Sequence, residues 1–217
     1  MKRFKYMAFA LCAFMLVTAC ARKPHSTADV TRLLPQSYRI SVAPFTQPLA
    51  PGQLLTGQIP ENQGKAPQDA LLALDADLRK ALIAQTRRQY NFLPAAHPYD
   101  DLGITHATAQ PDALDRWIAY GRKHNAQFLL VPQVLNWHER EGSQAGVEQS
   151  AHARVEFFLL NVKDGEIAAR STFEEKQVGL VDNLLGVADF FKRKGQWVTA
   201  QQLSDDGIDK AIKDLGL

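Results

Sequence analysis

The chain has 217 residues, a formal net charge of +2 and only two cysteines, Cys12 and Cys20. A near-neutral balance lacks the basic excess typical of nucleic-acid-binding proteins, so we expect no nucleic-acid partner. No cysteine follows Cys20, so no disulfide is expected and the core alone must stabilise the rest of the chain, which is long enough to bury one.

Residues 1–19 have the pattern of an export signal. Three cations, Lys2, Arg3 and Lys5, precede an apolar run from Met7 to Val17. This run is shorter than the roughly 20 residues of a membrane-spanning helix. We therefore expect residues 1–19 to be a signal peptide that is removed. Subtracting its three cations from +2 leaves a mature chain of charge −1.

The residues Val17-Thr18-Ala19-Cys20 resemble the lipobox of bacterial lipoproteins, in which an aliphatic and two small residues precede an invariant cysteine. The resemblance implies a diacylglycerol on the Cys20 thiol and a further acyl chain on its freed amine. Two or more chains anchor a protein stably, whereas one binds only marginally. Ala21, in place of an aspartate, favours the periplasmic face of the outer membrane. The alternative is an ordinary secretory signal with a chance cysteine.

Residues 20–36 are polar and include two prolines, which predicts a flexible tether between the lipid and the body. Leu33 and Leu34 are expected to dock on that body. Residues 37–217 would then form one periplasmic α/β domain.

The first half of this domain predicts alternating strands and helices. Ile40 and Val42 alternate with polar neighbours, which predicts a strand over Tyr38–Phe45 that Pro44 ends. The connection 46–66 is long, and connections of this length are often functional. A helix should begin at Pro67, because leucines recur at helical spacing after it. They are Leu71, Leu74, Leu78 and Leu82.

A short strand, Tyr90–Leu93, and an irregular stretch, 95–110, come next. Pro111 opens a second predicted helix. Its inner side should carry Leu114, Trp117, Ile118 and Gly121. The continuous apolar run Phe128–Val131 extends to Trp137 and is typical of a central strand covered on both faces.

A polar turn, 141–147, leads into strand 151–157, in which polar residues such as Arg154 and Glu156 alternate outward. Asp164-Gly165 predicts a tight turn into a last strand from Glu166 to about Gln177. The inner face of that strand should carry Ile167, Ala169 and Phe173.

Two helices end the chain. The first should cover Asn183–Arg193, with Gly195 as its C-cap, and the second should begin at Thr199, where Thr199-Ala200-Gln201-Gln202 matches a capping box. Strand–helix–strand units impose parallel pairing. The order strand–helix–strand–helix–strand–strand–strand–helix–helix predicts an α/β fold with a single mixed sheet. Three parallel strands are followed by antiparallel hairpins, and helices pack on the sheet in two or three layers.

Three motifs resemble a known group of periplasmic domains: Ile40-Ser41-Val42-Ala43-Pro44-Phe45, Phe128 to Val131, and Asn161-Val162-Lys163-Asp164-Gly165-Glu166-Ile167. The group contains the curli-secretion lipoprotein, the outer-membrane lipoprotein activators of penicillin-binding peptidoglycan synthases, and the amino-terminal domain of the Tol translocation protein. The resemblance covers about residues 37–217. It implies a non-enzymatic binding or assembly module, with no catalytic motif to carry over.

One departure from this group concerns its pore-forming members, which have long amphipathic strands. The hairpin Gln133–Val155 carries charges on both faces, which would be costly in lipid. We therefore expect no secretion pore.

Motifs for chemistry are weak. Gly64-Lys65-Ala66 lacks the Ser or Thr that follows the lysine of a phosphate loop, and Ile59 stands where its first glycine belongs, so no nucleotide cofactor is expected. One loop contains four potential metal ligands, but polar loops are usually only solvated, and we expect no metal. These are His97, Asp100, Asp101 and His106. No serine has a nucleophile-elbow context, so we expect no catalytic residues and no enzyme.

Loops 46–66, 95–110 and 141–147 each leave the carboxyl end of a predicted strand. If the first three strands are parallel, these loops gather at one edge, where open α/β sheets bind ligands. The candidates for this binding edge are Tyr99, Asp100, His106, Trp137 and Arg140, with Trp137 as an exposed aromatic.

These features predict a membrane-anchored envelope lipoprotein that acts as a non-enzymatic protein-binding, structural or regulatory module with an envelope protein as partner. The alternative is a module that binds a small molecule or glycan for an envelope transporter or the cell wall. The sequence leaves the partner and the oligomeric state open.

Overall fold

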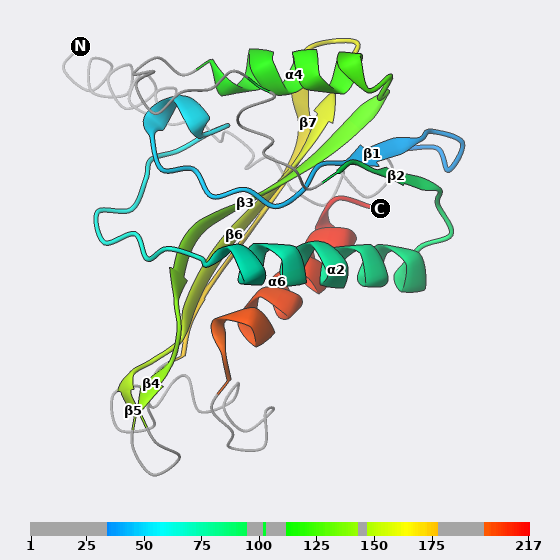
Figure 1. Cartoon of the computed structure of the whole chain (residues 1–217). Coiled ribbons are helices and arrows are strands. Elements are labelled where there is room, and N and C mark those ends of the chain that lie inside the picture. Colours follow the sequence, from blue (N-terminus) through cyan, green and yellow to red (C-terminus); the bar gives the residue numbers. More distant parts are fainter. Residues whose placement is uncertain (1–33, 95–101, 103–111, 143–146, 178–197) are drawn as a thin grey trace, which may run out of the picture.

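The computed structural model describes residues 34–94, 102, 112–142, 147–177 and 198–217 (Figure 1). In chain order the elements are β1 (Ile40–Val42), η3 (Pro51–Gln53), α2 (Gln68–Gln85), β2 (Tyr90–Phe92), α4 (Ala113–Lys123), β3 (Phe128–His138), β4 (Glu141–Gly142), β5 (Val147–Gln149), β6 (His152–Asn161), β7 (Glu166–Lys176) and α6 (Ala200–Asp214). The expected signal peptide, the loop with four potential metal ligands and the helix expected at Asn183–Arg193 lie outside the described residues.

A mixed five-stranded sheet with the order β2-β1-β3-β6-β7 forms the centre of the domain. β1 pairs in parallel with both β2 and β3, and β6 pairs antiparallel with both β3 and β7. The apolar run that begins at Phe128 is therefore the middle strand, as predicted. The fold class predicted from the sequence, α/β with one mixed sheet and helices packed on it, is confirmed.

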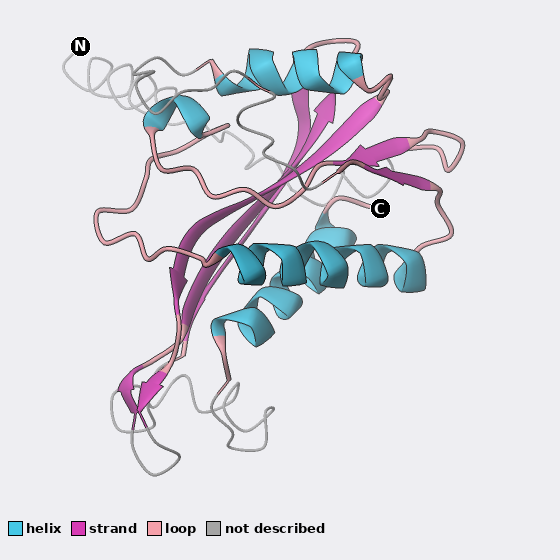
Figure 2. Cartoon of the chain, in the orientation of Figure 1, coloured by secondary structure: helices cyan, strands magenta, loops and turns pink. Residues whose placement is uncertain are grey.

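Helices cover both faces of the sheet, which gives three layers (Figure 2). On one face α2 and α6 pack against β-strand residues such as Leu130 and Phe157. On the other, Trp117 and Ile118 of α4 pack against Phe158. In the part of the chain that the structure describes, no helix is long and apolar enough to cross a membrane.

The helix boundaries follow the predicted local signals. Pro67 is the N-cap of α2, and Leu74, Leu78 and Leu82 are its buried residues. At α6, Thr199 Oγ1 accepts a hydrogen bond from the Gln202 backbone N–H, and Gln202 Oε1 accepts one from the Thr199 N–H. This reciprocal capping box is the one predicted from the sequence.

The predicted inner face of the last strand is wrong for Ile167. Leu159 pairs with Ala169 but Leu160 pairs with Ile167, so Ala168 is an extra residue in β7. An inserted residue in one strand reverses the side to which later residues point. Ile167 accordingly packs in the cluster under α4, whereas Ala169 packs under α2 and α6.

The predicted polar turn at 141–147 contains the short strands β4 and β5, which extend the β3–β6 hairpin beyond the helices (Figure 1). Glu141, Gly142 and Gln149 are exposed there. The sequence of this tip has no alternation that would have predicted its strands.

Candidate functional site

The α4 side of the sheet is covered over only half its length. Close to the β6–β7 turn, Phe158 and Leu160 pack with α4. Further along, the same side of the sheet carries polar residues, of which Glu174 is about half exposed, with 49% of its side chain accessible. We call this surface the polar face. It consists of Asn136 and His138 on β3, His152, Arg154 and Glu156 on β6, and Arg170, Thr172, Glu174 and Lys176 on β7.

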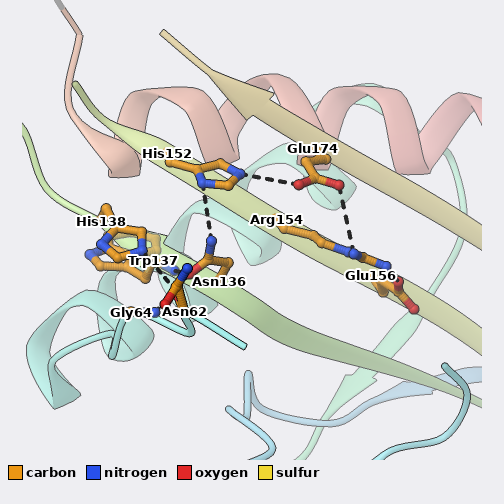
Figure 3. Close-up of polar contacts among 9 residues, drawn as sticks. All are labelled: Asn62, Gly64, Asn136, Trp137, His138, His152, Arg154, Glu156 and Glu174. Carbon is orange, nitrogen blue, oxygen red and sulfur yellow. Dashed lines mark hydrogen bonds and ion pairs between the residues drawn. The ribbon is translucent and has the colours of Figure 1, made fainter. Parts of the chain in front are cut away.

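Asn136 connects the polar face to the long connection after β1 (Figure 3). Its Oδ1 accepts hydrogen bonds from the backbone N–H groups of Gly64, at 2.7 Å, and Trp137, at 3.0 Å. The amide oxygen is therefore fixed by two donors. Its Nδ2 group must face the Nδ1 atom of His152, 3.0 Å away.

These contacts assign the tautomers of two histidines. His152 Nδ1 accepts from Asn136, so its Nε2–H donates to Glu174 at 3.2 Å. His138 Nε2–H donates to the carbonyl of Asn62 at 3.1 Å, and its Nδ1 accepts from Gln149 at 3.3 Å. The two rings stack with their centroids 6.0 Å apart and an interplanar angle of 16°. The two imidazoles link Gln149 of the tip to residues of β3, β6 and β7.

Glu156 is the buried centre of the polar face. The sequence predicted an outward, solvated residue; it does point away from α2 and α6, but it is 0% exposed. Two guanidinium groups cover it, because Arg154 donates to Oε1 at 3.0 Å and Arg170 donates to Oε2 at 2.7 Å. A buried carboxylate needs such partners, since desolvation without them is costly.

The two arginines differ in their surroundings. Arg154 also approaches Glu174 at 3.7 Å, and 27% of its side chain is exposed. Arg170 lies over the ring of Phe158, with its Cζ atom 5.5 Å from the centroid, and 39% of its side chain is exposed. The Arg154–Glu156–Arg170 triad thus carries a net charge of +1 at the surface.

The connection 46–66 is described throughout and is held along β3. Gln133 Nε2 donates to the carbonyl of Gln53, and its Oε1 accepts from Leu55 N–H. Gly64 packs so closely that a Cβ built there would lie 1.9 Å from the Trp137 carbonyl oxygen. Gly64-Lys65 is therefore a packing element.

The structure brings together only part of the predicted binding edge. β3 continues for eight residues beyond Leu130, the partner of the last residue of β1, and the connection 46–66 follows it to its end. Trp137 is there but is 2% exposed and belongs to the core, which corrects the expectation of an exposed aromatic. Arg140 is half-buried between β3 and β4. Tyr99, Asp100 and His106 lie outside the described residues.

A second polar region lies between α2 and α6, where Asp77, Lys80, Asp205 and Asp209 line a groove. Partial burial and, to a smaller extent, the neighbouring carboxylates Asp77, Asp206 and Asp209 together raise the pKa of Asp205 to about 6. Among the described residues no group of three or more His, Cys, Asp or Glu side chains is arranged to hold a metal ion.

Sequence reasoning missed the triad because Arg170 lies on β7, whereas Arg154 and Glu156 lie on β6. Arg154 and Glu156 looked like ordinary outward residues of an alternating strand, and Arg170 carried no motif. Only the register, which places Arg170 opposite Phe158 and Arg154 opposite Glu174, shows that these charges converge.

No family model matches the chain, and no curated protein matches it. Solved structures resemble it at low identity. The PelC dodecamer from Paraburkholderia phytofirmans is 16% identical with a TM-score of 0.45, covering 84% of this chain and 90% of that chain. Lipoprotein GNA1162 from Neisseria meningitidis is 12% identical with a TM-score of 0.38, covering 73% and 99%. The LpoB C-terminal domain from Salmonella enterica is 12% identical with a TM-score of 0.37, covering 70% and 93%.

All three likenesses are distant, with identities of 12% to 16% and TM-scores below 0.5. What those proteins bind or assemble with remains a property of those proteins.

Proposed function

We propose that this protein is a lipid-anchored module of the bacterial envelope that binds another envelope protein and catalyses no reaction. The basic start, the short apolar run and the lipobox ending at Cys20 support the anchor. On this proposal residues 1–19 are removed, residues 20–36 form the tether, and the body lies at the periplasmic face of the outer membrane.

The observation that carries the binding role is the polar face. It is a part of the sheet that no described helix covers, and its side chains are fixed by hydrogen bonds into one arrangement. A preorganised surface loses little side-chain entropy on binding, which favours affinity.

The position of the polar face relative to the tether supports this role. Ile40 pairs with Phe128, which pairs with Asn161, so the tether enters at this end of the sheet. His138, His152 and Lys176 pair at the other end. Ten residues of β3 separate the two ends, about 33 Å at roughly 3.3 Å per residue. The end of the polar face at His138, His152 and Lys176 therefore lies far from the expected anchor, whereas Arg170 lies three residues of β3 from the tether end.

The test is photo-crosslinking in the native cell from a reactive residue placed at Thr172, an exposed position on the polar face. The matched control places the same residue at Ala76, which is exposed on α2 at the opposite side of the sheet. We expect a discrete protein adduct from Thr172 and none from Ala76. Equal labelling from both positions, or none from either, would contradict the proposal.

A hollow at the tether end keeps the second candidate function open. It measures about 620 Å³, and Tyr38, Arg122, Asn125 and Gln127 are among its lining residues. Aromatic, amide and cationic side chains together suit a glycan. If the hollow binds a glycan, titration with soluble peptidoglycan fragments should shift the NMR signals of Asn125 and Gln127. Unchanged signals at millimolar concentrations of the fragments would contradict glycan binding at this hollow.

A further inference from the structure

We infer that Arg154 and Arg170, held by the buried Glu156, form a receptor for a carboxylate on an acidic segment of the partner protein. This inference rests on the proposed function and names the chemistry of the partner at the same surface.

The first step concerns the unusual position of Glu156. A buried ion pair contributes little net stability, because desolvation offsets most of the attraction, and apolar residues of similar volume often serve as well. Glu156 does something that an apolar residue could not do: each of its two oxygens fixes a different guanidinium group (Figure 3 shows the Arg154 contact). The arrangement is therefore suited to orienting arginines.

The second step concerns what Arg170 leaves available. Nη2 donates to Glu156, and the guanidinium plane lies near the Phe158 ring, so the group is held on two sides. Within the described chain, Nε and Nη1 of Arg170 have no hydrogen-bond partner, and 39% of the side chain is exposed. An arginine N–H group donates a strong, charge-assisted hydrogen bond to a carboxylate oxygen, so the remaining donors of Arg170 can bind a carboxylate of the partner.

The third step concerns charge. One glutamate is shared by two arginines, and Glu174 reaches only Arg154, at 3.7 Å. Thr172, between Arg170 and Glu174 on this side of β7, is short and exposed, so it leaves room for an incoming group. The local excess of positive charge at Arg170 is complementary to an acidic side chain and repels a basic one.

Phosphate groups of lipids are also anions that arginine binds. Arg170 pairs with Phe158, which pairs with Val131, and three residues of β3, or about 10 Å at roughly 3.3 Å per residue, separate Val131 from the end at which the tether enters. The expected tether of residues 20–36 separates that end from the membrane, and we commit to a protein carboxylate.

The experiment repeats the Thr172 crosslink in chains that carry Arg170→Ala, Arg170→Lys or the control Arg39→Ala. Arg39 is exposed at the tether end and lies outside the polar face. We expect the adduct to fall at least about tenfold with Arg170→Ala, because arginine anchors are common interface hot spots. Arg170→Lys should retain an intermediate yield, and Arg39→Ala the full yield. Urea unfolding of each purified chain checks that the variants fold.

Mass spectrometry of the native adduct then identifies the partner segment. We expect an aspartate or glutamate of the partner within a few residues of the crosslinked site. Arg170→Glu in this protein should abolish the adduct, and changing that acidic residue of the partner to arginine should restore it. An adduct that survives Arg170→Ala, a segment without an acid, or labelling of lipid alone would overturn the receptor while leaving a binding surface. Absence of any adduct in the native chain would instead overturn the proposed function.

Discussion

Glu156 organises the polar face by pairing with two arginines from different strands. Removing its charge leaves both guanidinium groups beside a neutral amide. Loss of one partner of a fully buried pair costs about 3–5 kcal/mol. The arginines here are 27% and 39% exposed and can recover water.

We therefore predict that Glu156→Gln lowers the free energy of unfolding by about 1–3 kcal/mol, measured by urea denaturation. The matched control is Glu174→Gln, because Glu174 contacts His152 and Arg154 but is 49% exposed. The free energy of unfolding of Glu174→Gln should stay within about 0.5 kcal/mol of the native value, as for other exposed ion pairs. Equal losses in the two variants would show that burial of Glu156 does not matter.

Gly64 is required because β3 passes so close to it. A Cβ at this position would lie 1.9 Å from the Trp137 carbonyl oxygen and 2.8 Å from its carbon, both backbone atoms that move little. We predict that Gly64→Ala lowers the free energy of unfolding by about 2 kcal/mol or more, as overpacking does.

The comparison for this prediction is Gly57→Ala. No atom lies within 4 Å of a Cβ at Gly57, but its φ is +84°, so the cost there is backbone strain of about 1 kcal/mol. In thermal unfolding, the melting temperature of the Gly64→Ala variant should be lower than that of the Gly57→Ala variant. The reverse order would mean that the connection 46–66 adjusts freely along β3.

At the scale of the element, α6 depends on its capping box. Thr199 and Gln202 exchange two hydrogen bonds that satisfy backbone N–H groups at the start of the helix. We predict that Thr199→Ala costs about 1 kcal/mol of unfolding free energy. The control is Thr172→Ala, which removes an exposed threonine from a strand. A neutral result for Thr199→Ala would show that packing of α6 on the sheet suffices without the cap.

The contact between α2 and α6 contributes a pH dependence. The pKa of Asp205 in the folded chain is about 6, above its ordinary value of 3.8, mainly because of burial. The folded state thus binds this proton more tightly than the unfolded state, so stability declines as pH rises from about 4 to about 6. Above about pH 6, Asp205 is ionised in the folded chain and its destabilising effect on the free energy of unfolding is fully present.

We predict that Asp205→Asn is more stable than the native chain at pH 7 by about 0.5–1 kcal/mol, a small value because the side chain is only partly buried and water screens its charge. At pH 3.5 the two should have the same stability. Asp75, whose pKa burial also raises to about 6, is present in both chains, so its contribution cancels in the difference. A constant difference between the chains across pH would contradict the assignment to Asp205.

For the whole molecule, the proposed lipid on Cys20 determines where the protein resides. Several acyl chains give stable attachment to a membrane. We predict that Cys20→Ser moves the protein from the membrane fraction to the soluble fraction of the native cell. Intact mass measurement of the native protein should show acyl chains on the residue that begins the mature chain. Membrane attachment that persists in Cys20→Ser would refute the lipoprotein assignment.

Much of the fold was predictable because its signals are local. The leucine spacing that begins after Pro67, the apolar run at Phe128 and the capping box at Thr199 are each contained in a few neighbouring residues. Such patterns reflect the periodicity of a helix or strand and need no knowledge of the partner element. The β4–β5 tip was missed because its sequence lacks the alternation of a half-buried strand. The bulge at Ala168 was missed because it depends on the pairing of β6 with β7.

The candidate site was far less predictable. Trp137 was expected at the surface because its neighbours Asn136 and His138 are polar. The structure places it in the core, since alternation along the strand turns those neighbours to the opposite side of the sheet. The triad of Arg154, Glu156 and Arg170 required the register of two strands.

The sequence by itself determined the order of the elements, the class of the fold and the prediction of a lipid anchor, because periodicity, capping and a lipobox are properties of consecutive residues. Only the tertiary structure decided which charges meet, which tryptophan is buried and which half of the sheet stays open. Those features depend on strand register and on how far each helix reaches over the sheet, and both are set by contacts between residues that lie far apart in the chain.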